Sequence, residues 1–433
     1  MKLPHHMSPR RIRVVLRRHG PEALVWRRRV AIVGGAVMVG IVALIFADVA
    51  DRANALFHGF VARWWWAPLI ATPAGFALIA WLTIRFAPLA RGSGIPQVMA
   101  ATKAPEAALS TLVSVRAAVA KFVLTAGALL IGASVGREGP TVQIAAAIMG
   151  RMHRLLRIPL RSSVYIAGGA AGVAAAFNTP LAGVAFAIEE LAAAYEQRMT
   201  LLVMAAVLIA GMVSLGIAGD YIYFGAMRQT LGFTQALVAA PVAGIVGGIA
   251  GGVFSRLMLE AGRTTLPPFG RLRTRPVLFA SLCGAVVAIT GVATGLTWGT
   301  GYESANHIIA GGDVPAWFGI AKFVSTLATA VSGIPGGIFA PSLSIGAGIG
   351  ALLREVFPGY SPGAIVLLGM VGYFTGVVRA PLTAVIIISE TTASRGLMMP
   401  LLASALTADF AAQFVCKEKL YHGLSQRFLQ APK

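Results

Sequence analysis

A glutamate stands at a break in an apolar stretch of the chain, where it could compete with an anion. The stretch covers residues 130–150, and GREGP at residues 136–140 interrupts it. Pro140 suits the first turn of a helix, and the glycines before it allow close backbone approach, so we expect a helix to begin here. Within a bilayer, the free amides and positive dipole end of such a helix would attract an anion, and Glu138 would sit at that end. A helix-start carboxylate that faces water is the alternative, and the pentapeptide alone leaves both open.

Two further breaks carry groups of the same kind. GSGIP at residues 92–96 places Ser93 between two glycines and just before Ile95-Pro96, which is another expected helix start. A hydroxyl donor would therefore lie beside exposed backbone amides. The third break is GGIFAP at residues 336–341. A serine in a surface turn is the alternative for Ser93, but three such interruptions in one apolar chain favour a common site.

Composition places these breaks in a membrane protein. Of the 433 residues, 57% are hydrophobic and only 12% are charged, and the mean hydropathy is +0.77. This balance is far from that of a soluble domain and indicates a polytopic membrane protein. Several apolar stretches are too short or too rich in glycine for a simple span of roughly 20 residues. We therefore expect broken or re-entrant helices, which are tolerated where protein or a water-filled cavity surrounds them.

The positive charge is concentrated at the two ends of the chain. The net charge is 36 − 16 = +20. Basic residues within the first thirty positions, opposed by Glu22, are Lys2, Arg10, Arg11, Arg13, Arg17, Arg18, Arg27, Arg28 and Arg29, and those of the tail are Lys417, Lys419, Arg427 and Lys433. By the positive-inside rule both termini are expected in the cytoplasm. The arginine cluster directly precedes an apolar segment, so membrane topology explains it better than nucleic-acid binding.

Cysteine content and the N-terminal region exclude some classes of protein. Cys283 and Cys416 both lie in apolar surroundings and are too few for a disulfide framework or a metal site. The basic region is nearly thirty residues long and runs into a full-length apolar span, so we expect no cleavable signal peptide.

Two halves of the chain match each other at an offset of 201 residues (381 − 180). The offset aligns glycines, prolines and a glutamate over nearly sixty residues, with these pairs: Gly132 and Gly333, Gly136 and Gly337, Pro140 and Pro341, Ile144 and Ile345, Gly168 and Gly369, Pro180 and Pro381, Glu189 and Glu390. Two structural repeats are therefore expected. Interrupted apolar segments at corresponding positions of two repeats point to a transporter's midplane site. The offset does not give the relative orientation of the repeats.

The three breaks GSGIP, GREGP and GGIFAP, in this order, resemble the motifs of the CLC family of chloride channels and proton-coupled chloride transporters. Each motif alone is a weak indication of the family, whereas the three motifs in this order are highly specific for it. The resemblance continues through AAFNTPLAGVAFAIEEL at residues 175–191, through RAPLTAVIIISE at residues 379–390, and to Tyr421. It covers nearly all of residues 30–430.

The resemblance implies an anion site and a gate. Ser93 and Tyr421 would donate hydroxyls to a central anion, and the backbone amides of Ile338 and Phe339 would join them. Chloride needs several directed donors but little full positive charge, because otherwise it would bind too tightly to leave. Glu138 would be the gating glutamate. Its ionised form would fill the outer anion site and its protonation would release that site, so anion passage and proton movement would share one side chain.

The resemblance also implies an inner site of proton transfer. Glu190 matches the proton-accepting glutamate that many of the family's transporters carry and its channels lack, so proton transfer is assigned to Glu190 and Glu138. The alternative for Glu190 is a carboxylate that caps a helix end and pairs with Arg198. Its neighbour Glu189 is interpreted as a structural residue at a helix end.

Other polar residues are expected to have structural roles, and the sequence departs from the family pattern in two places. Lys121 and Glu390 lie within apolar runs, and for both we expect a buried structural pairing rather than transport chemistry. Gln97 follows GSGIP where an acidic residue is frequent. The chain stops twelve residues after Tyr421, so the paired cytoplasmic nucleotide-binding domains of many relatives are not expected.

The expected architecture is an all-α polytopic membrane protein that forms a homodimer, with two inverted repeats of broken and tilted helices in each subunit. Residues 1–29 would form a basic cytoplasmic segment. Residues 30–433 would form one transport domain, with repeats at roughly 30–220 and 235–430. The expected place is the cell's inner (plasma) membrane. The partners would be chloride, protons and membrane lipid, with no nucleic acid, no metal and no cofactor.

Three functions compete. The leading hypothesis is a chloride/proton antiporter, and the alternative within the same fold is a passive, voltage- or pH-gated chloride (anion) channel. A membrane-embedded hydrolase would need a nucleophile with a base or a set of metal ligands. His153 and His307 lack such partners in the sequence, which argues against an enzyme.

Overall fold

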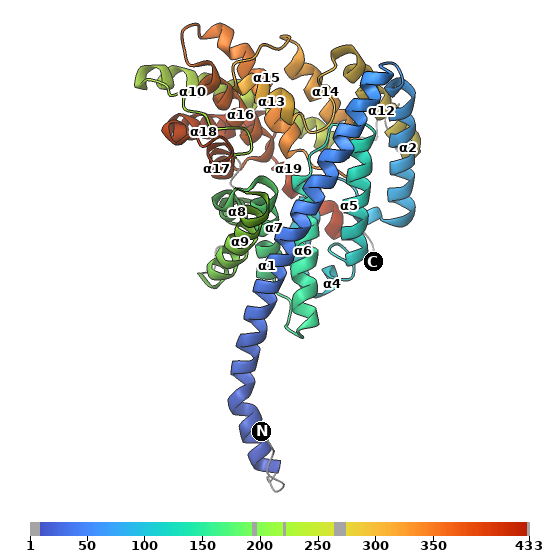
Figure 1. Ribbon diagram of the computed structural model, residues 1–433, viewed down its shortest axis with the longest axis vertical. Coiled ribbons are helices and arrows are strands. Elements are labelled where there is room, and N and C mark those ends of the chain that lie inside the picture. Colours follow the sequence, from blue (N-terminus) through green and yellow to red (C-terminus); the bar gives the residue numbers. More distant parts are fainter. Residues whose placement is uncertain (1–8, 193–196, 220–221, 264–273, 431–433) are drawn as a thin grey trace.

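The computed structural model of the chain describes residues 9–192, 197–219, 222–263 and 274–430. Over these ranges the chain is built of helices, and the only β-structure consists of two isolated bridges. The predicted all-α fold is confirmed. Figure 1 shows the helices packed into one body, from which the N-terminal end of α1 projects.

The helices before residue 220 form the first half of the molecule. They are α1 (Pro9–Arg63), α2 (Pro68–Phe86), α3 (Ile95–Lys103), α4 (Pro105–Ala108), α5 (Val115–Leu130), α6 (Glu138–Leu155), α7 (Ser162–Phe177), α8 (Pro180–Phe186) and α9 (Gln197–Ala218), with a 3-10 turn η1 (Pro88–Ala90) and a π-turn η2 (Ala187–Leu191).

The helices after residue 222 form the second half. They are α10 (Phe233–Ala261), α12 (Pro276–Thr294), α13 (Tyr302–Ile309), α14 (Phe318–Val331), α15 (Phe339–Val356), α16 (Pro362–Val378), α17 (Pro381–Thr392), α18 (Met398–Val415) and α19 (Leu420–Gln430), with a 3-10 turn η3 (Arg395–Leu397).

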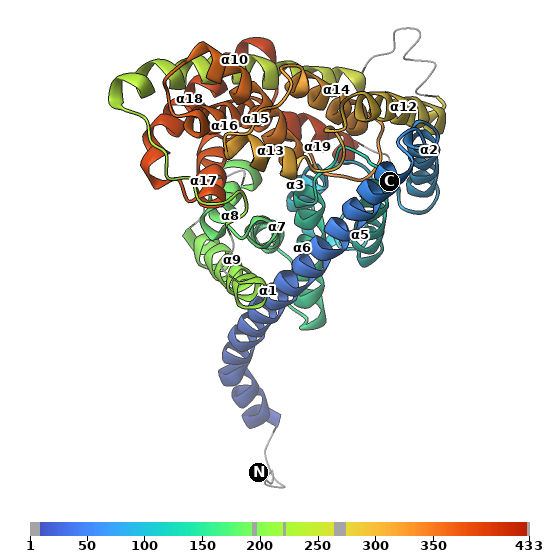
Figure 2. The same cartoon turned by 45° about the horizontal axis from the view of Figure 1, so that its top comes forward.

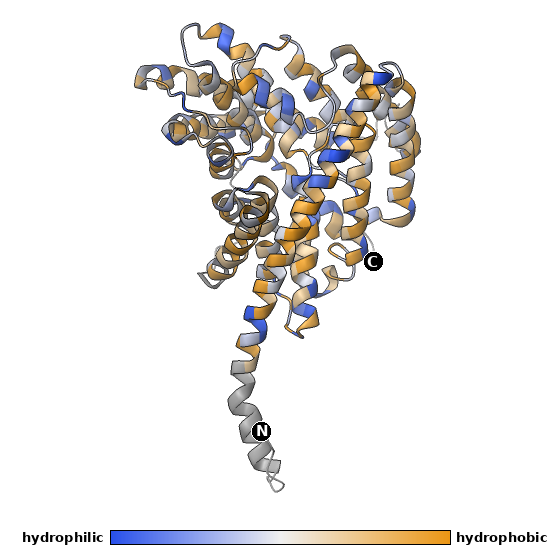
Figure 3. Cartoon of the chain, viewed as in Figure 1, coloured by the Kyte–Doolittle hydropathy of each residue, from blue (hydrophilic) through white to orange (hydrophobic). Residues whose placement is uncertain are grey.

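Helix lengths bear out the expectation of broken spans. Six helices in the described residues are long and apolar enough to cross a membrane, and α7, α14, α16 and α17 are apolar but only 10–17 residues long. Figure 3 shows apolar residues covering most of the helical surface. The chain is a multi-pass membrane protein in which the short helices must share the membrane with their neighbours.

The two halves repeat each other in structure as well as in sequence. Helices α6 and α15 begin at residues 138 and 339, α8 and α17 at 180 and 381, and α9 and α18 at 197 and 398, each pair at the offset of 201. Backbone irregularities repeat too, because Asn178 and Arg379 both end a helix in the left-handed region, at φ 56° and 60°.

The repeats are inverted, as the family resemblance implied. Gly136 and Gly337 occupy equivalent positions, and each donates its amide to the other's carbonyl, at 2.7 and 2.8 Å, in an antiparallel bridge. Such a reciprocal pair lies where two equivalent segments run in opposite directions past each other. The bridge joins the residues that precede α6 and α15, so the two helices start from a common point.

Two equivalent helices form the centre of the molecule. Every residue of α16 after Pro362 is buried, and α7 is buried from Val164 to its end. Figures 1 and 2 show α6 and α7 on one side of the body and α15, α16 and α18 on the other. The central helices hold α6 and α15 in place, because α7 packs on α6 and α16 packs on α15.

The basic N-terminal segment is not separate from the first helix. Helix α1 runs without interruption from Pro9 to Arg63, so residue 30, where we expect the transport domain to begin, lies inside it. Lys2 and Lys433 lie outside the described residues, as do the side chains of the arginines at positions 10–18 and of Glu22. The predicted domain limits and the cytoplasmic position of this segment stay predictions.

Candidate functional site

The three sequence breaks meet at one place in the interior. The amide of Gly92 donates to the Ile334 carbonyl at 3.2 Å, and the amide of Gly336 returns a bond to the Gly92 carbonyl at 3.1 Å. Together with the Gly136–Gly337 bridge, these bonds join all three segments. Glycine is required here for space, since a Cβ on Gly337 would lie 3.0 Å from the Gly136 carbonyl oxygen and 3.0 Å from the Gly139 amide nitrogen.

Three helices begin at this junction. Helix α3 starts at Ile95, α6 at Glu138 and α15 at Phe339, and each has a proline in its first turn or directly after its start. The expected helix starts at GREGP and GSGIP are confirmed. At none of the three starts does the side chain of the N-cap residue itself make a capping bond. The first amides of a helix have no acceptor within it, so three positive dipole ends face a shared interior region.

Two hydroxyl groups lie at this junction without partners. Ser93 is buried, and its Oγ lies against the start of α6, because a Cβ on Gly139 would be 2.5 Å from it. Tyr421, the second residue of α19, is fully buried and lies within interaction range of Ser93. Neither hydroxyl makes a hydrogen bond to any described residue. Buried hydroxyls are normally satisfied, so both are available to a bound anion.

The predicted amide donors lie at the start of α15. Ile338 and Phe339 are both buried. The ring of Phe339 is 6.1 Å from that of Tyr421 and 4.9 Å from that of Phe374, centre to centre. Phe177 and Phe186 contact Phe339 as well. The amides of residues 338 and 339 therefore lie within an apolar aromatic collar, which limits how much water can reach a bound ion.

Glu138 is buried at the meeting point of α6 and α15. Its side chain is 0% exposed, so the alternative of a water-facing carboxylate is wrong. Oε2 accepts from the Ala340 amide at 3.4 Å, which places the carboxylate over the first turn of α15. Oε1 has no partner among the described residues. A carboxylate held in this way occupies a place that the helix ends make favourable for an anion.

The arginine next to Glu138 is already paired. The Arg137 guanidinium bonds to Asp51 Oδ2 at 2.7 Å and to the Ala47 carbonyl at 2.8 Å, both through Nη1. It lies outside the junction and joins α6 to α1. The Arg137 guanidinium is therefore directed at Asp51 rather than at the hydroxyls of Ser93 and Tyr421.

Glu190 and Glu189 are adjacent but have different surroundings. Glu190 lies in the π-turn η2, is only 4% exposed, and both its carboxylate oxygens lack partners among the described residues. Lys419 acts on it electrostatically. The structure does not show the helix-capping alternative for Glu190, and the side chain of Arg198 lies outside the described residues.

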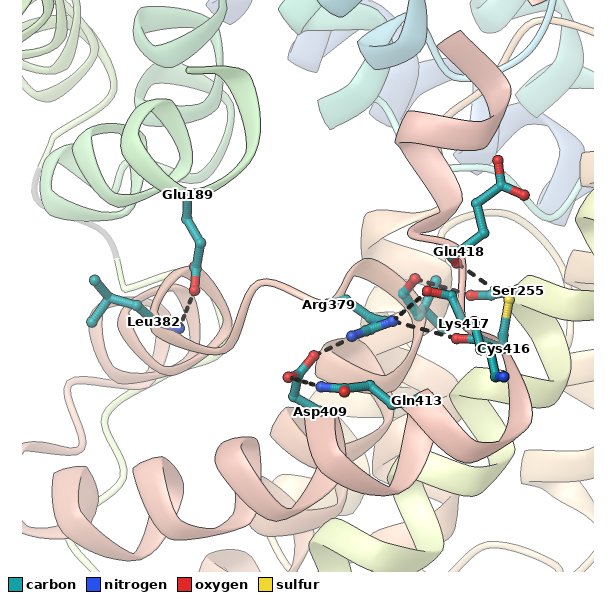
Figure 4. Close-up of polar contacts among 10 residues, drawn as sticks. Glu189, Ser255, Arg379, Leu382, Asp409, Gln413, Cys416, Lys417 and Glu418 are labelled. Atoms are coloured by element: carbon teal, nitrogen blue, oxygen red, sulfur yellow. Dashed lines mark hydrogen bonds and ion pairs between the residues drawn. The ribbon is translucent and has the colours of Figure 1, made fainter. Parts of the chain in front are cut away.

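Glu189 instead caps a helix of the other repeat. Its carboxylate accepts from the amide of Leu382 at 3.1 Å (Figure 4) and from the amide of Thr383 at 2.8 Å, at the start of α17. Glu390, its repeat counterpart, accepts from the amides of Leu181 and Ala182 at the start of α8, at 3.2 and 2.8 Å. The two carboxylates are fully used in this exchange, so both are structural, as expected. Glu390 pairs with backbone amides rather than with a basic side chain.

Lys121 and Gln97 hold the loop that carries Ser93, and the sequence did not predict these roles. Lys121 was expected in a buried pairing, but its Nζ bonds to the Gly92 carbonyl, at 2.7 Å, next to Ser93. Gln97 donates through Nε2 to the carbonyls of Leu89 and Arg91, at 3.1 and 2.7 Å. An acidic residue at this position could not donate these bonds. The departure from the family pattern thus has a local structural role.

A third residue of this kind leads to Tyr421. Arg379 donates to Asp409 Oδ1 at 3.0 Å and to the carbonyls of Cys416 and Lys417 at 3.3 and 3.1 Å (Figure 4). These carbonyls lie in the link between α18 and α19, just before Tyr421. Its repeat counterpart is Asn178. The sequence signal for its role was a charged residue two positions before Pro381, within an otherwise apolar segment.

Comparison with known proteins gives a consistent result. A family model described as "Voltage gated chloride channel" matches residues 75–413. The H(+)/Cl(-) exchange transporter ClcA of Yersinia pestis is 32% identical over 400 residues, covering 83% of this chain and 81% of the relative. ClcA of Vibrio parahaemolyticus is 30% identical over 388 residues, covering 85% and 81%. The crystal structure of a slow cyanobacterial Cl-/H+ antiporter has a TM-score of 0.80 at 25% identity, covering 94% of this chain and 98% of that one.

Proposed function

The chain belongs to the CLC family of chloride channels and proton-coupled chloride transporters, and from this premise we propose that it is an antiporter that exchanges chloride for protons. Relatives named as H(+)/Cl(-) exchangers support the reaction. The observation that carries it in this chain is Glu190, a buried carboxylate with no hydrogen-bond partner among the described residues. The test is whether a chloride gradient alone drives protons uphill in liposomes.

The anion path we propose runs through the junction of α3, α6 and α15. Ser93, Tyr421 and the amides of Ile338 and Phe339 would bind chloride, since all four are donors without full charge. Lys121 supports this assignment, because its ammonium group is turned to the carbonyl of Gly92. A site made of dipoles and hydroxyls binds a halide weakly enough for it to leave.

The gate we propose is Glu138. Its carboxylate would occupy the anion position next to the Ser93 site while ionised and leave it when protonated. Burial supports this role, because a buried unpaired carboxylate must be compensated either by nearby donors or by taking up a proton. The Ala340 amide supplies only one long bond. The ionised carboxylate therefore competes directly with an anion for one place, and protonation removes that competition.

The proton path we propose begins at Glu190. Tyr421 lies within electrostatic range of both Glu190 and Glu138, which supports an anion site near both carboxylates. Protons cannot follow the anion donors, because dipole ends that favour chloride disfavour a cation. A titratable group on the inner side, separate from the anion path, meets this need.

A homodimer in the inner membrane, with both termini in the cytoplasm, completes the proposal. Its face would be formed by α8, α9, α17 and α18, which lie together on the left in Figure 1. Segments 203–217 and 410–415, which are rich in small residues, are candidates for this face. In α9 the small residues Ala206 and Ala210 are buried within the subunit instead. The free surface carries large apolar side chains, among them Met212, Phe410 and Phe414.

Removing two of these side chains should weaken the dimer. Phe410 and Phe414 are 64% and 75% exposed, and their rings lie 4.9 Å apart. We expect the wild type in mild detergent to run at twice the chain mass of 44.9 kDa, and Phe410→Ala/Phe414→Ala to shift it toward the monomer, because helix association in membranes depends on packing. Light scattering after gel filtration measures the mass.

The matched control for the dimer removes apolar area elsewhere. Leu78 and Leu282, on α2 and α12, are 56% and 47% exposed on another part of the surface. Leu78→Ala/Leu282→Ala should leave the mass unchanged. An active wild-type monomer under mild conditions would contradict the proposed dimer.

Ser93 should influence anion choice. The family resemblance implies nitrate preference when a proline stands at this position, so Ser93→Pro is expected to raise nitrate over chloride selectivity while transport persists. Ser93→Ala should weaken chloride binding about tenfold or more, because a hydrogen bond to a charged group contributes about 1.5–3 kcal/mol. Anion-exchange fluxes in liposomes give both quantities.

Ser255→Ala serves as the control for Ser93. This serine is also buried, but its hydroxyl donates to the Val377 carbonyl at 2.9 Å, outside the site. It should leave selectivity and chloride affinity unchanged. If Ser93→Pro and Ser93→Ala also leave them unchanged, Ser93 does not belong to the anion site.

A further inference from the structure

A cavity on the Arg137 side of the site is not used by the proposed mechanism. Its volume is about 550 Å³, and it lies between α1 and the segment that leads into α13. Asp51, Asn54, Arg137, Trp298, Thr300 and Tyr302 are among its lining residues. Because Arg137 directly precedes Glu138, the cavity adjoins the proposed gate.

The segment that borders this cavity repeats the loop of Ser93. Residues 299–302 read GTGY where residues 92–95 read GSGI, at an offset of 207 (299 − 92). The backbone agrees, since Gly92 and Gly94 have φ of 67° and 105°, and Gly299 and Gly301 have φ of 55° and 77°. Helix α13 begins directly after its loop, as α3 does. Thr300 therefore stands where Ser93 stands in the first repeat.

The same kind of lysine holds both loops. Lys121 and Lys322 are equivalent at the offset of 201, and both are fully buried. Lys322 Nζ donates to the carbonyls of Gly299 and Thr297, at 2.8 and 2.9 Å, just as Lys121 donates to Gly92. In each repeat the loop carbonyls are therefore turned toward an ammonium group, away from the helix start.

The cavity wall also contains an unsatisfied cationic donor. Arg137 is 6% exposed, and its Nε has no partner among the described residues although Nη1 is bound to Asp51. Thr300 Oγ accepts a 3.3 Å bond from the Tyr302 amide, which leaves its hydroxyl hydrogen available to donate. A hydroxyl donor, a helix start and a guanidinium group thus border one space.

We propose that this cavity is a third anion site, outside the position that Glu138 fills, in which a halide is held by the Thr300 hydroxyl and the Arg137 guanidinium before it reaches Glu138. The inference rests on the proposed function, because it takes the Ser93 loop as an anion site and Thr300 as its counterpart. Asp51 and the exposed Glu303 also line the cavity, as do His58 and His307. The two carboxylates oppose binding, so the outer site holds its ion more weakly than the Ser93 site.

Anomalous diffraction from crystals soaked in a bromide series tests this site. The wild type should show bromide beside Ser93 at low concentration and in the outer cavity at higher concentration. Thr300→Val keeps the side-chain shape but removes the hydroxyl, and it should raise the concentration for half occupancy of the outer site about tenfold, leaving the Ser93 site unchanged. Glu303→Gln removes an opposing charge from an exposed side chain and should lower that concentration.

The outcomes separate this inference from the proposed function. Bromide beside Ser93 with none in the outer cavity across the series overturns the outer site alone. Outer bromide that neither Thr300→Val nor Glu303→Gln affects marks an adventitious ion only, and also overturns it. Bromide at neither place contradicts the proposed anion site itself.

Discussion

Replacing Glu138 with glutamine is expected to abolish proton movement while chloride still flows. Glutamine has nearly the shape of a protonated glutamate but cannot take up or release a proton. The pH dependence of chloride flux should disappear with the proton flux, because the outer anion position would no longer be blocked by a charged side chain. Chloride and proton fluxes recorded together in liposomes measure both effects.

The geometry explains why one substitution should separate the two ions. Glu138 is buried, and its carboxylate lies over the Ala340 amide at the start of α15. A negative charge at this place competes with chloride for the same dipole end, whereas a neutral amide does not. The proposed gate therefore requires the wild type to protonate Glu138 in order to pass an anion, and Glu138→Gln removes that requirement.

Glu390→Gln is the matched control for this experiment. Glu390 is also partly buried at a helix start, where it accepts from Leu181 and Ala182. A glutamine oxygen can still accept hydrogen bonds, so coupling should persist. Proton transport that continues in Glu138→Gln would show that the gate is another residue.

Replacing Glu190 with glutamine is expected to suppress proton flux about a hundredfold or more, the usual contribution of a positioned proton-transfer group. Chloride flux should continue, because Glu190 lies in η2 rather than among the donors at the start of α15. Its carboxylate has no hydrogen-bond partner among the described residues. Removing its charge therefore breaks no described contact, and a loss of coupling would report proton transfer rather than misfolding.

The adjacent glutamate provides the control for Glu190. Glu189 accepts three bonds from Leu382 and Thr383 through its two carboxylate oxygens, and Glu189→Gln keeps one of these accepting oxygens. Coupling should be unchanged in this variant. The reverse pattern, with coupling lost in Glu189→Gln and retained in Glu190→Gln, would transfer the inner relay to Glu189.

The sequence predicted the helix starts of the candidate site better than the contacts that hold them in place. Glycine and proline mark helix starts at GSGIP and GREGP because backbone geometry limits which residues fit there. Ser93 and Glu138 could therefore be assigned to a common site. Tyr421 could be assigned only through family resemblance, because nothing local in the sequence connects α19 with α3.

The contacts between the repeats could not be predicted in the same way. Glu189 and Glu390 align at the offset of 201, but their exchange of helix caps becomes visible only when the repeats are known to be inverted. Lys121 and Lys322 bond to backbone carbonyls, which leave no mark on the sequence of their partners. The match of Thr300 to Ser93 was hidden because its offset differs by six residues (207 − 201) from that of the other pairs.

The most direct test of the account is made on the wild-type protein in liposomes with a chloride gradient and no initial proton gradient. We predict that chloride moving down its gradient drives protons in the opposite direction, against the proton gradient that this movement builds. An uncoupler that dissipates the proton gradient should not stop chloride flux. Chloride flux without any coupled proton movement would contradict the antiporter and leave a passive anion channel of the same fold.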